Sequence, residues 1–261
     1  MVVNLKSRDL ILVSGKDSLT FLQSQFSNDI SRIVDNQIQI NCYCQHQGKV
    51  LAIVWVIKID GLFYLSIPSE LSDLVLEKLN LYKLMSDVDF EDVTGKIYQY
   101  GLIDETKGMK LYKNLNLLIS QEQLSDYDCS YWEEQCVLNK IPEIAFSASQ
   151  KFIPQVLNLD VDELGVSFTK GCYPGQEVVA RMHYLGKPKR RLFRFTSKFE
   201  VCIGDYLNVN NSTSLKSSGQ IIRVAKKDAE FQFLGVFEVS HINDYIFLNN
   251  DQTKSVTIIH E

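Results

Sequence analysis

The chain has 261 residues, of which 45% are hydrophobic and 23% are charged, and its formal net charge is −5. This composition is typical of a globular protein with a sizeable core, and it excludes an intrinsically disordered chain. The acidic balance argues against general binding to DNA or RNA.

The sequence shows no pattern of secretion or of a membrane span. Its longest apolar run, residues 50–57, is far shorter than the ~20 residues that a spanning helix needs. Lys6, Arg8 and Asp9 stand where a signal peptide would be apolar. The 6 cysteines are therefore not expected to form a disulfide framework. We expect a cytoplasmic protein with no membrane partner.

The N-terminal part of the chain alternates strand and helix patterns. An apolar run predicts a buried strand over residues 9–13, and apolar residues at helical spacing predict a helix over 17–27. Residues 50–57 and 62–67 predict two strands. Asp60-Gly61 would join them in a hairpin turn, because glycine tolerates a positive φ.

The same alternation continues through the middle of the chain. Ser69 is the expected N-cap of a helix whose apolar stripe ends at Tyr82. Strands are expected over 97–103 and 111–119, and a further helix is expected over 131–140.

After about residue 190 the pattern changes to short strands. The expected strands cover residues 192–196, 206–209, 220–224, 231–239 and 256–260. Evenly spaced short strands with polar turns are typical of a small barrel. The sequence therefore predicts an α+β protein with a mixed core over 1–188 and a β-barrel over 189–261.

The segment Lys170–Glu177, here called the signature loop, reads Lys-Gly-Cys-Tyr-Pro-Gly-Gln-Glu. Residues 173–176 fit a type II turn, with proline second and glycine third, and a short helix is expected over 176–182. Cys172 would then lie just before a helix N-terminus. Helix termini and nearby cations, for which Lys170 and Arg181 are candidates, make a thiol more reactive, although a lone cysteine is more often a small core residue. Cys172 is thus a candidate functional thiol.

The signature loop also carries a family resemblance. Together with Val179-Ala180-Arg181 it resembles the K-G-C-Y-x-G-Q-E-x-x-x-R signature of the YgfZ family. Phe152-Ile153-Pro154-Gln155, Asn158-Leu159 and Gly165-Val166-Ser167-Phe168 resemble the segments that precede this signature in the family. A weaker similarity covers most of the chain.

The resemblance implies the fold of the folate-binding aminomethyltransferase of the glycine cleavage system, with interlocked N-terminal subdomains and a C-terminal β-barrel. It implies binding of tetrahydrofolate or a related folate, and support of iron–sulfur enzymes, including one that thiolates tRNA. Iron–sulfur enzymes or their assembly proteins would be the partners. The functional residue of the family is the motif cysteine, which is Cys172 here. The residues expected to contact folate are Phe152, Gln155, Lys170, Tyr173, Gln176, Glu177 and Arg181.

The sequence departs from the family at one wall of the expected folate site. Some members place aromatic folate contacts at positions that are Arg8 and Ile141 here. Leu138 and Lys140 replace the Arg and Gly of the family's Arg-x-Gly-x-Pro segment, and only Pro142 remains. The residues of the signature loop therefore match the family more closely than the residues of the folate wall do.

Two smaller groups of cysteine and histidine residues could form sites, but each also has a simpler structural explanation. Cys42, Cys44 and His46 offer the start of a metal site, but more ligands would be needed, and no metal site is predicted. The two cysteines are more simply small residues on one face of a strand. His183 could pair with Cys172 as a nucleophile's base, although no third orienting group can be assigned.

A basic strip without acidic residues extends over 178–199. Its cations are Arg181, Lys187, Lys189, Arg190, Arg191, Arg194 and Lys198. The strip would either guard an exposed strand edge by charge or face an anionic partner. That partner would be a folate polyglutamate tail, an RNA phosphate or an acidic protein.

The leading interpretation is a folate-dependent factor that supports assembly or repair of iron–sulfur enzymes through Cys172, without being a conventional enzyme. The alternative is an aminomethyl transferase that uses tetrahydrofolate. The cysteine motif favours the first, because those transferases do not resemble it there. A third interpretation is an RNA- or protein-docking module that uses the basic strip, but the acidic net charge counts against it.

Overall fold

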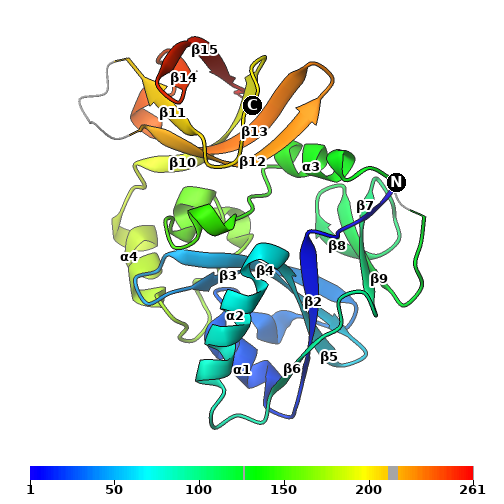
Figure 1. Cartoon of the computed structure of the whole chain (residues 1–261). Helices are drawn as coiled ribbons and strands as arrows, with labels where there is room; N and C mark the ends of the chain where they lie inside the picture. The colour runs from blue at the N-terminus through cyan, green and yellow to red at the C-terminus, as the bar shows by residue number, and fades with distance from the viewer. Residues whose placement is uncertain (126, 211–216, 261) are drawn as a thin grey trace.

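Two antiparallel sheets and a closed barrel form the framework of the protein (Figure 1). This arrangement is seen in a computed structural model, which describes residues 1–125, 127–210 and 217–260. The residues outside these ranges include the predicted end of the barrel at 261 and part of the segment between its second and third predicted strands. The fold is α+β, as predicted.

The five-stranded sheet lies at the centre of the larger part of the molecule. Its order is β3-β4-β5-β2-β6, from the strands β2 (Arg8–Ser14), β3 (Gln37–Cys44), β4 (Val50–Ile59), β5 (Leu62–Pro68) and β6 (Asp89–Asp92). Every residue from 50 to 57 is buried, which explains the unbroken apolar run of β4. The strands predicted over 9–13, 50–57 and 62–67 are confirmed. A strand at Cys42 and Cys44 was expected without bounds, and it is the end of β3, whereas β6 was not predicted.

Two helices pack beside this sheet, α1 (Ser18–Gln25) and α2 (Ser69–Tyr82). The buried side of α2 includes Leu71, Val75 and Leu79, part of its predicted apolar stripe. The prediction that Ser69 caps α2 is wrong, because Ser69 is already helical and Pro68 holds the cap position. The Ser69 hydroxyl instead donates to the Asp9 carboxylate of β2 at 2.6 Å.

The four-stranded sheet explains why the N-terminal subdomains interlock. Its order is β1-β7-β9-β8, from the strands β1 (Val2–Asn4), β7 (Tyr98–Ile103), β8 (Met109–Tyr112) and β9 (Leu115–Ser120). The chain therefore starts in this sheet, builds the five-stranded sheet and then returns. The single strand predicted over 111–119 is wrong, because Lys113, with φ 43°, turns the chain between β8 and β9.

The barrel is closed by six strands in the order β10-β13-β12-β11-β14-β15. They are β10 (Arg190–Ser197), β11 (Tyr206–Val209), β12 (Gly219–Lys227), β13 (Glu230–Glu238), β14 (Ile246–Leu248) and β15 (Asp251–Ile258). Phe195, Phe233 and Phe237 form the centre of a core that belongs to the barrel alone. The predicted barrel is confirmed, although β14 was missed and β15 begins earlier than expected. The division between residues 188 and 189 stays a prediction.

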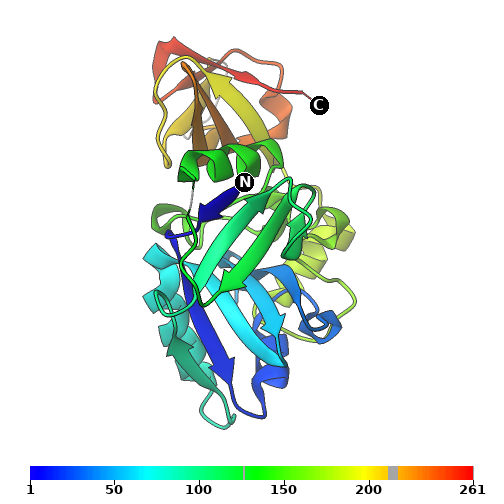
Figure 2. The ribbon, with the colours of Figure 1, turned by 90° about the vertical axis from the view of Figure 1, so that its right-hand side faces the viewer.

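The helix α3 (Cys129–Leu138) joins the barrel to the rest of the molecule. It contacts β12 and β13 on one side and β1 and β7 on the other, and Figure 2 shows it between the barrel and the four-stranded sheet. A long irregular segment follows, with short 3₁₀ turns at Phe146–Ala148, Pro154–Leu157 and Val161–Glu163, and it leads to α4 (Gln176–Leu185). Within the described residues, no helix is long and apolar enough to cross a membrane.

Candidate functional site

The signature loop is closed by a type II turn, as predicted. Gly175 has φ 81° and ψ 1°, and the Gln176 amide donates to the Tyr173 carbonyl at 3.2 Å. A Cβ on Gly175 would lie 2.5 Å from the Gln45 carbonyl oxygen and 2.6 Å from the Gly48 Cα. Glycine is therefore required here both for its positive φ and for the close packing against the turn after β3.

Cys172 lies in the exposed part of this loop. All six cysteines are free, and Cys172 is exposed together with Cys129 and Cys202. The preceding Gly171 faces open space, because no other heavy atom lies within 4 Å of the position of its Cβ. The helix α4 begins directly after the turn, as the sequence predicted. The Cys172 thiol is thus accessible to a small molecule or a partner protein.

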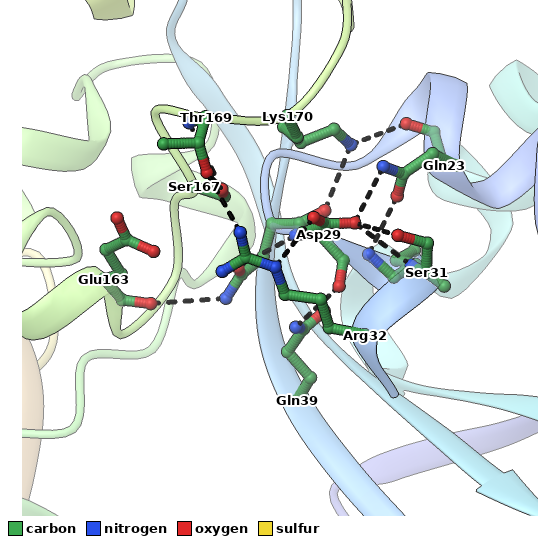
Figure 3. A network of polar contacts seen from close by, with 11 residues as sticks. Gln23, Asp29, Ser31, Arg32, Gln39, Glu163, Ser167, Thr169 and Lys170 are labelled. Carbon is green, nitrogen blue, oxygen red and sulfur yellow. Dashed lines mark hydrogen bonds and ion pairs between the residues drawn. The ribbon is translucent and has the colours of Figure 1, made fainter. Parts of the chain in front are cut away.

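Lys170, two residues before Cys172, is buried instead. Its Nζ donates to the carbonyl oxygen of Gln23 at 2.6 Å (Figure 3), and to those of Phe26 at 2.5 Å and Asn28 at 3.0 Å. Burial lowers the pKa of Lys170 to about 8, and the nearby Asp29 opposes this effect. Lys170 thus ties the signature loop to the end of α1.

The other predicted folate contacts lie in two different environments. Phe152 and Gln155 belong to the buried interior, and the Gln155 amide donates to the Val179 carbonyl of α4 at 2.7 Å. Tyr173 is also buried, and burial raises the pKa of its phenol. By contrast, Glu177 and Arg181 are exposed on α4, and Gln176 is half-buried. The structure gathers these residues around α4, but their contact with folate stays a prediction.

A cavity of about 470 Å³ lies elsewhere, where the core meets the barrel. The starts of β2 and α2, the helix α3, the segment after α3 and the strand β12 contribute to its wall. The lining includes Arg8, Trp132, Glu133, Glu143, Ile222 and Arg223, and it does not include Cys172, Phe152 or Gln155. Its volume is in the usual range for small-molecule sites, and an apolar wall with a few charged groups is typical of such sites.

The buried Arg8 and the half-buried Glu143 form an ion pair in this wall. The Arg8 guanidinium binds the Glu143 carboxylate, donates to the Ser66 carbonyl at 2.7 Å and stacks on Trp55, 3.8 Å from the ring centroid. Burial raises the pKa of Glu143, although Arg8 and Arg223 oppose this shift. The second oxygen of Glu143 accepts a long bond from the Ile144 amide at 3.3 Å. Arg8 therefore fixes a carboxylate that retains acceptor capacity.

A second buried arginine contributes to the same wall from the barrel. Arg223 of β12 binds Glu133 of α3 through two nitrogens, at 2.8 and 3.1 Å, and donates to the Ile141 carbonyl at 3.0 Å. The barrel is therefore joined to the core by a charged contact at the cavity. Arg8 and Ile141 were predicted as departures from the family pattern, whereas Glu133, Glu143 and Arg223 were not predicted. These residues are distant in the sequence, and only the tertiary fold brings them together.

The smaller constellations have simpler roles in the structure. The His183 ring stacks on Phe168, with ring centroids 3.6 Å apart. Cys42 and Cys44 are buried, and the His46 ring lies 3.1 Å from the Tyr82 hydroxyl. In the part of the chain that the structure describes, no group of three or more His, Cys, Asp or Glu residues could hold a metal ion.

The basic strip is partly neutralised by ion pairs. Arg190 binds Glu238 at 2.8 Å and Arg191 binds Asp160 at 2.6 Å. The exposed cations of the strip are Arg181, Lys187, Lys189 and Lys198. The exposed cations of the strip are therefore fewer than the sequence suggested, and Arg181, Lys187 and Lys189 lie in or just after α4.

Comparison with known proteins gives a consistent picture. No family model matches the chain. The chain is 28% identical over 235 residues to the "tRNA-modifying protein YgfZ" of Colwellia psychrerythraea, covering 76% of this chain and 72% of the relative. Five other bacterial proteins of that name are 24% to 28% identical to this chain.

Two further matches broaden this comparison. The "Iron-sulfur cluster assembly factor IBA57 homolog, mitochondrial" of Dictyostelium discoideum is 28% identical over 255 residues, covering 74% of this chain and 61% of the relative. The crystal structure of the glycine cleavage system aminomethyltransferase T from Bartonella henselae superposes with a TM-score of 0.69 and 10% identity. That match covers 100% of this chain and 84% of the other, and it confirms the predicted fold. Relatives of one name thus match most of its length at 24% to 28% identity, which supports the predicted resemblance to the YgfZ family.

Proposed function

We propose that this protein is a folate-dependent factor that supports the assembly or repair of iron–sulfur enzymes, including tRNA-thiolating enzymes, and that it acts through Cys172. The observation that carries the proposal is the exposed thiol of Cys172, directly before the type II turn of the signature loop. The names of its relatives, a tRNA-modifying protein and an iron–sulfur cluster assembly factor, support the same direction. Iron–sulfur enzymes or their assembly proteins are the proposed partners.

The chemistry of Cys172 suits such a role. A thiolate is both a nucleophile and a soft ligand, so an accessible one can take up a sulfur species or an iron atom for a short time. The six free cysteines suit a reducing compartment, and we place the protein in the cytoplasm.

The cavity at the barrel is the proposed folate site. Its volume of about 470 Å³ and its apolar wall fit a small ligand with one flat ring system. The free acceptor capacity of Glu143 suits the N–H groups of a pterin's aminopyrimidine edge, and Trp132 and Ile222 supply apolar surface. Bound tetrahydrofolate would supply a carrier of one-carbon units. The residues present thus fit the group, although they differ from those expected from the sequence.

The test of the central proposal compares two exposed cysteines. We expect Cys172→Ser to melt at the wild-type temperature and to fail to restore iron–sulfur enzyme activity in cells that lack the protein. Cys202→Ser, an equally exposed cysteine of the barrel part, should restore it fully. Equal rescue by both variants would refute the role of Cys172, and early melting of Cys172→Ser would make the cysteine structural.

The folate proposal is tested separately by thermal unfolding with tetrahydrofolate. A ligand at 100 times its dissociation constant should stabilise the protein by about 2.7 kcal/mol. Glu143→Gln should weaken this stabilisation, because an amide accepts the pterin's N–H groups less strongly than a carboxylate. No stabilisation of the wild type at millimolar folate would count against the proposal. Release of formaldehyde from an aminomethyl donor would instead favour the transferase alternative, which the fold alone supports.

A further inference from the structure

The two ends of the signature loop are held by different parts of the molecule. At its C-terminal end, Gly175 packs against Gln45 and Gly48 in the turn after β3. At its N-terminal end, Lys170 is buried against the end of α1. Cys172 lies between these two anchors, in the exposed part of the loop.

The Lys170 ammonium is saturated by its three contacts. An ammonium has three N–H donors, and each finds one carbonyl oxygen, from Gln23, Phe26 and Asn28. Gln23 belongs to the last turn of α1 and Phe26 is its C-cap, so two of these oxygens are carbonyls near a helix C-terminus. A cation is favourable at that end of a helix. With its donors used, Lys170 acts on the protein rather than on a ligand.

The residues before Lys170 reinforce the same attachment. The Thr169 hydroxyl accepts from Arg32 at 3.2 Å, and the Ser167 amide donates to the Ser27 carbonyl at 3.0 Å. The Ser27 hydroxyl in turn donates to the Gly165 carbonyl at 2.5 Å. Figure 3 shows that Thr169, Ser167 and Lys170 come from one side of this network and Gln23, Asp29 and Arg32 from the other.

We propose that Lys170 is a positioning residue for Cys172, whose ammonium clamps the entrance of the signature loop to the end of α1. Without the clamp, Gly171 and its exposed neighbours would leave this end of the loop free to move, since glycine restricts the backbone least. A functional thiol needs a rigid surrounding to meet its partner in one geometry. The inference rests on the proposed role of Cys172 and deepens it.

The experiment compares Lys170→Met with Lys170→Arg and with Lys107→Met. Methionine keeps the apolar stem but removes all three donors, arginine keeps a charged donor, and Lys107 is an exposed lysine between β7 and β8. The probes, here called the two loop amides, are the amide of Ser167 just before the signature loop and the amide of Gln176 within it, which are bonded to Ser27 and Tyr173, with the amides of barrel strand β13 as reference.

In Lys170→Met we expect hydrogen exchange at both loop amides to quicken by at least about tenfold, or about 1.4 kcal/mol, while the β13 amides stay unchanged. The variant should also fail to rescue iron–sulfur enzyme activity in cells. Lys170→Arg should recover part of the protection and part of the rescue. Lys107→Met should behave as wild type in both measurements.

Three results would overturn the proposal. Unchanged exchange at the two loop amides would show that Lys170 does not clamp the loop. Full rescue despite faster exchange would show that the clamp does not serve Cys172, and equal acceleration at β13 would make Lys170 a general stabilising residue. Rescue by Cys172→Ser would refute the proposed function itself, whereas the exchange of Lys170→Met would still decide whether the clamp exists.

Discussion

The signature loop and the cavity at the barrel are built in opposite ways. The loop is one continuous segment whose shape follows from its own residues, with Pro174 and Gly175 closing a turn and Cys172 left exposed. The cavity wall comes from distant parts of the chain, and its central ion pair joins Arg8 to Glu143 across 135 positions. A local motif can thus be recognised in the sequence, whereas a pocket of this kind forms only through tertiary packing.

The largest expected effect on stability comes from removing the Arg8–Glu143 ion pair in the cavity wall. Arg8→Met should lower the free energy of unfolding by about 2–4 kcal/mol, somewhat less than for a fully buried pair, because it leaves the half-buried Glu143 carboxylate without its partner. The double variant Arg8→Met/Glu143→Met should recover part of that loss, since no unpaired charge remains. Chemical denaturation measures both. Lys96→Met, which breaks an exposed pair with Glu91, should change stability by less than about 1 kcal/mol.

An Arg8→Met variant as stable as Lys96→Met would mean that water reaches Glu143 freely. The wall would then be an open surface, and the proposed folate site would lose the fixed carboxylate on which it depends.

A smaller effect is expected within the signature loop, where two glycines make a matched pair. Gly175→Ala should cost about 1–3 kcal/mol, because alanine must adopt a positive φ against the Gln45 carbonyl. Gly171→Ala should stay within about 0.5 kcal/mol, because its Cβ meets only open space. Thermal unfolding of the two variants checks the pair. Equal costs would show that the turn is not seated on the residues after β3.

The same contrast explains what the sequence could and could not predict. The type II turn, α4 and β4 were predictable, because proline–glycine offsets and an unbroken apolar run are local signals. The start of β3 was missed because polar side chains alternate there, although its end at Cys42 and Cys44 was expected to be a strand. The strand β6 was missed because its sequence is Asp-Phe-Glu-Asp. These two strands form because a neighbouring strand offers them hydrogen bonds, and no local propensity indicates that.

The same distinction between local signals and tertiary packing applies to the residues of the candidate site. The sequence singled out Cys172 by its neighbours, and the structure leaves it exposed directly before the type II turn. It offered Lys170 as a candidate folate contact, whereas the structure uses its three donors on carbonyls of residues 23–28, because the chain folds back over α1. Glu143 carried no local signal, since a single acidic residue after a proline is ordinary until Arg8 lies against it.

The smallest expected effect concerns the protonation of Lys170. Burial lowers the pKa of Lys170 to about 8, below the value of about 10.4 in an unfolded chain. Between these values the unfolded chain binds more protons than the folded one, so stability rises with pH. We expect wild type to gain about 1 kcal/mol relative to Lys170→Met between pH 8 and 9. Below pH 8 both states carry the charge, and the difference should be constant. Denaturant unfolding at several pH values measures it, with Lys187→Met as a control that should show no such change.

The carbonyls of Gln23, Phe26 and Asn28 favour the charged form and act against burial. A difference that stays flat or falls above pH 8 would therefore mean that these oxygens outweigh desolvation, and that the clamp keeps its full charge throughout the physiological range.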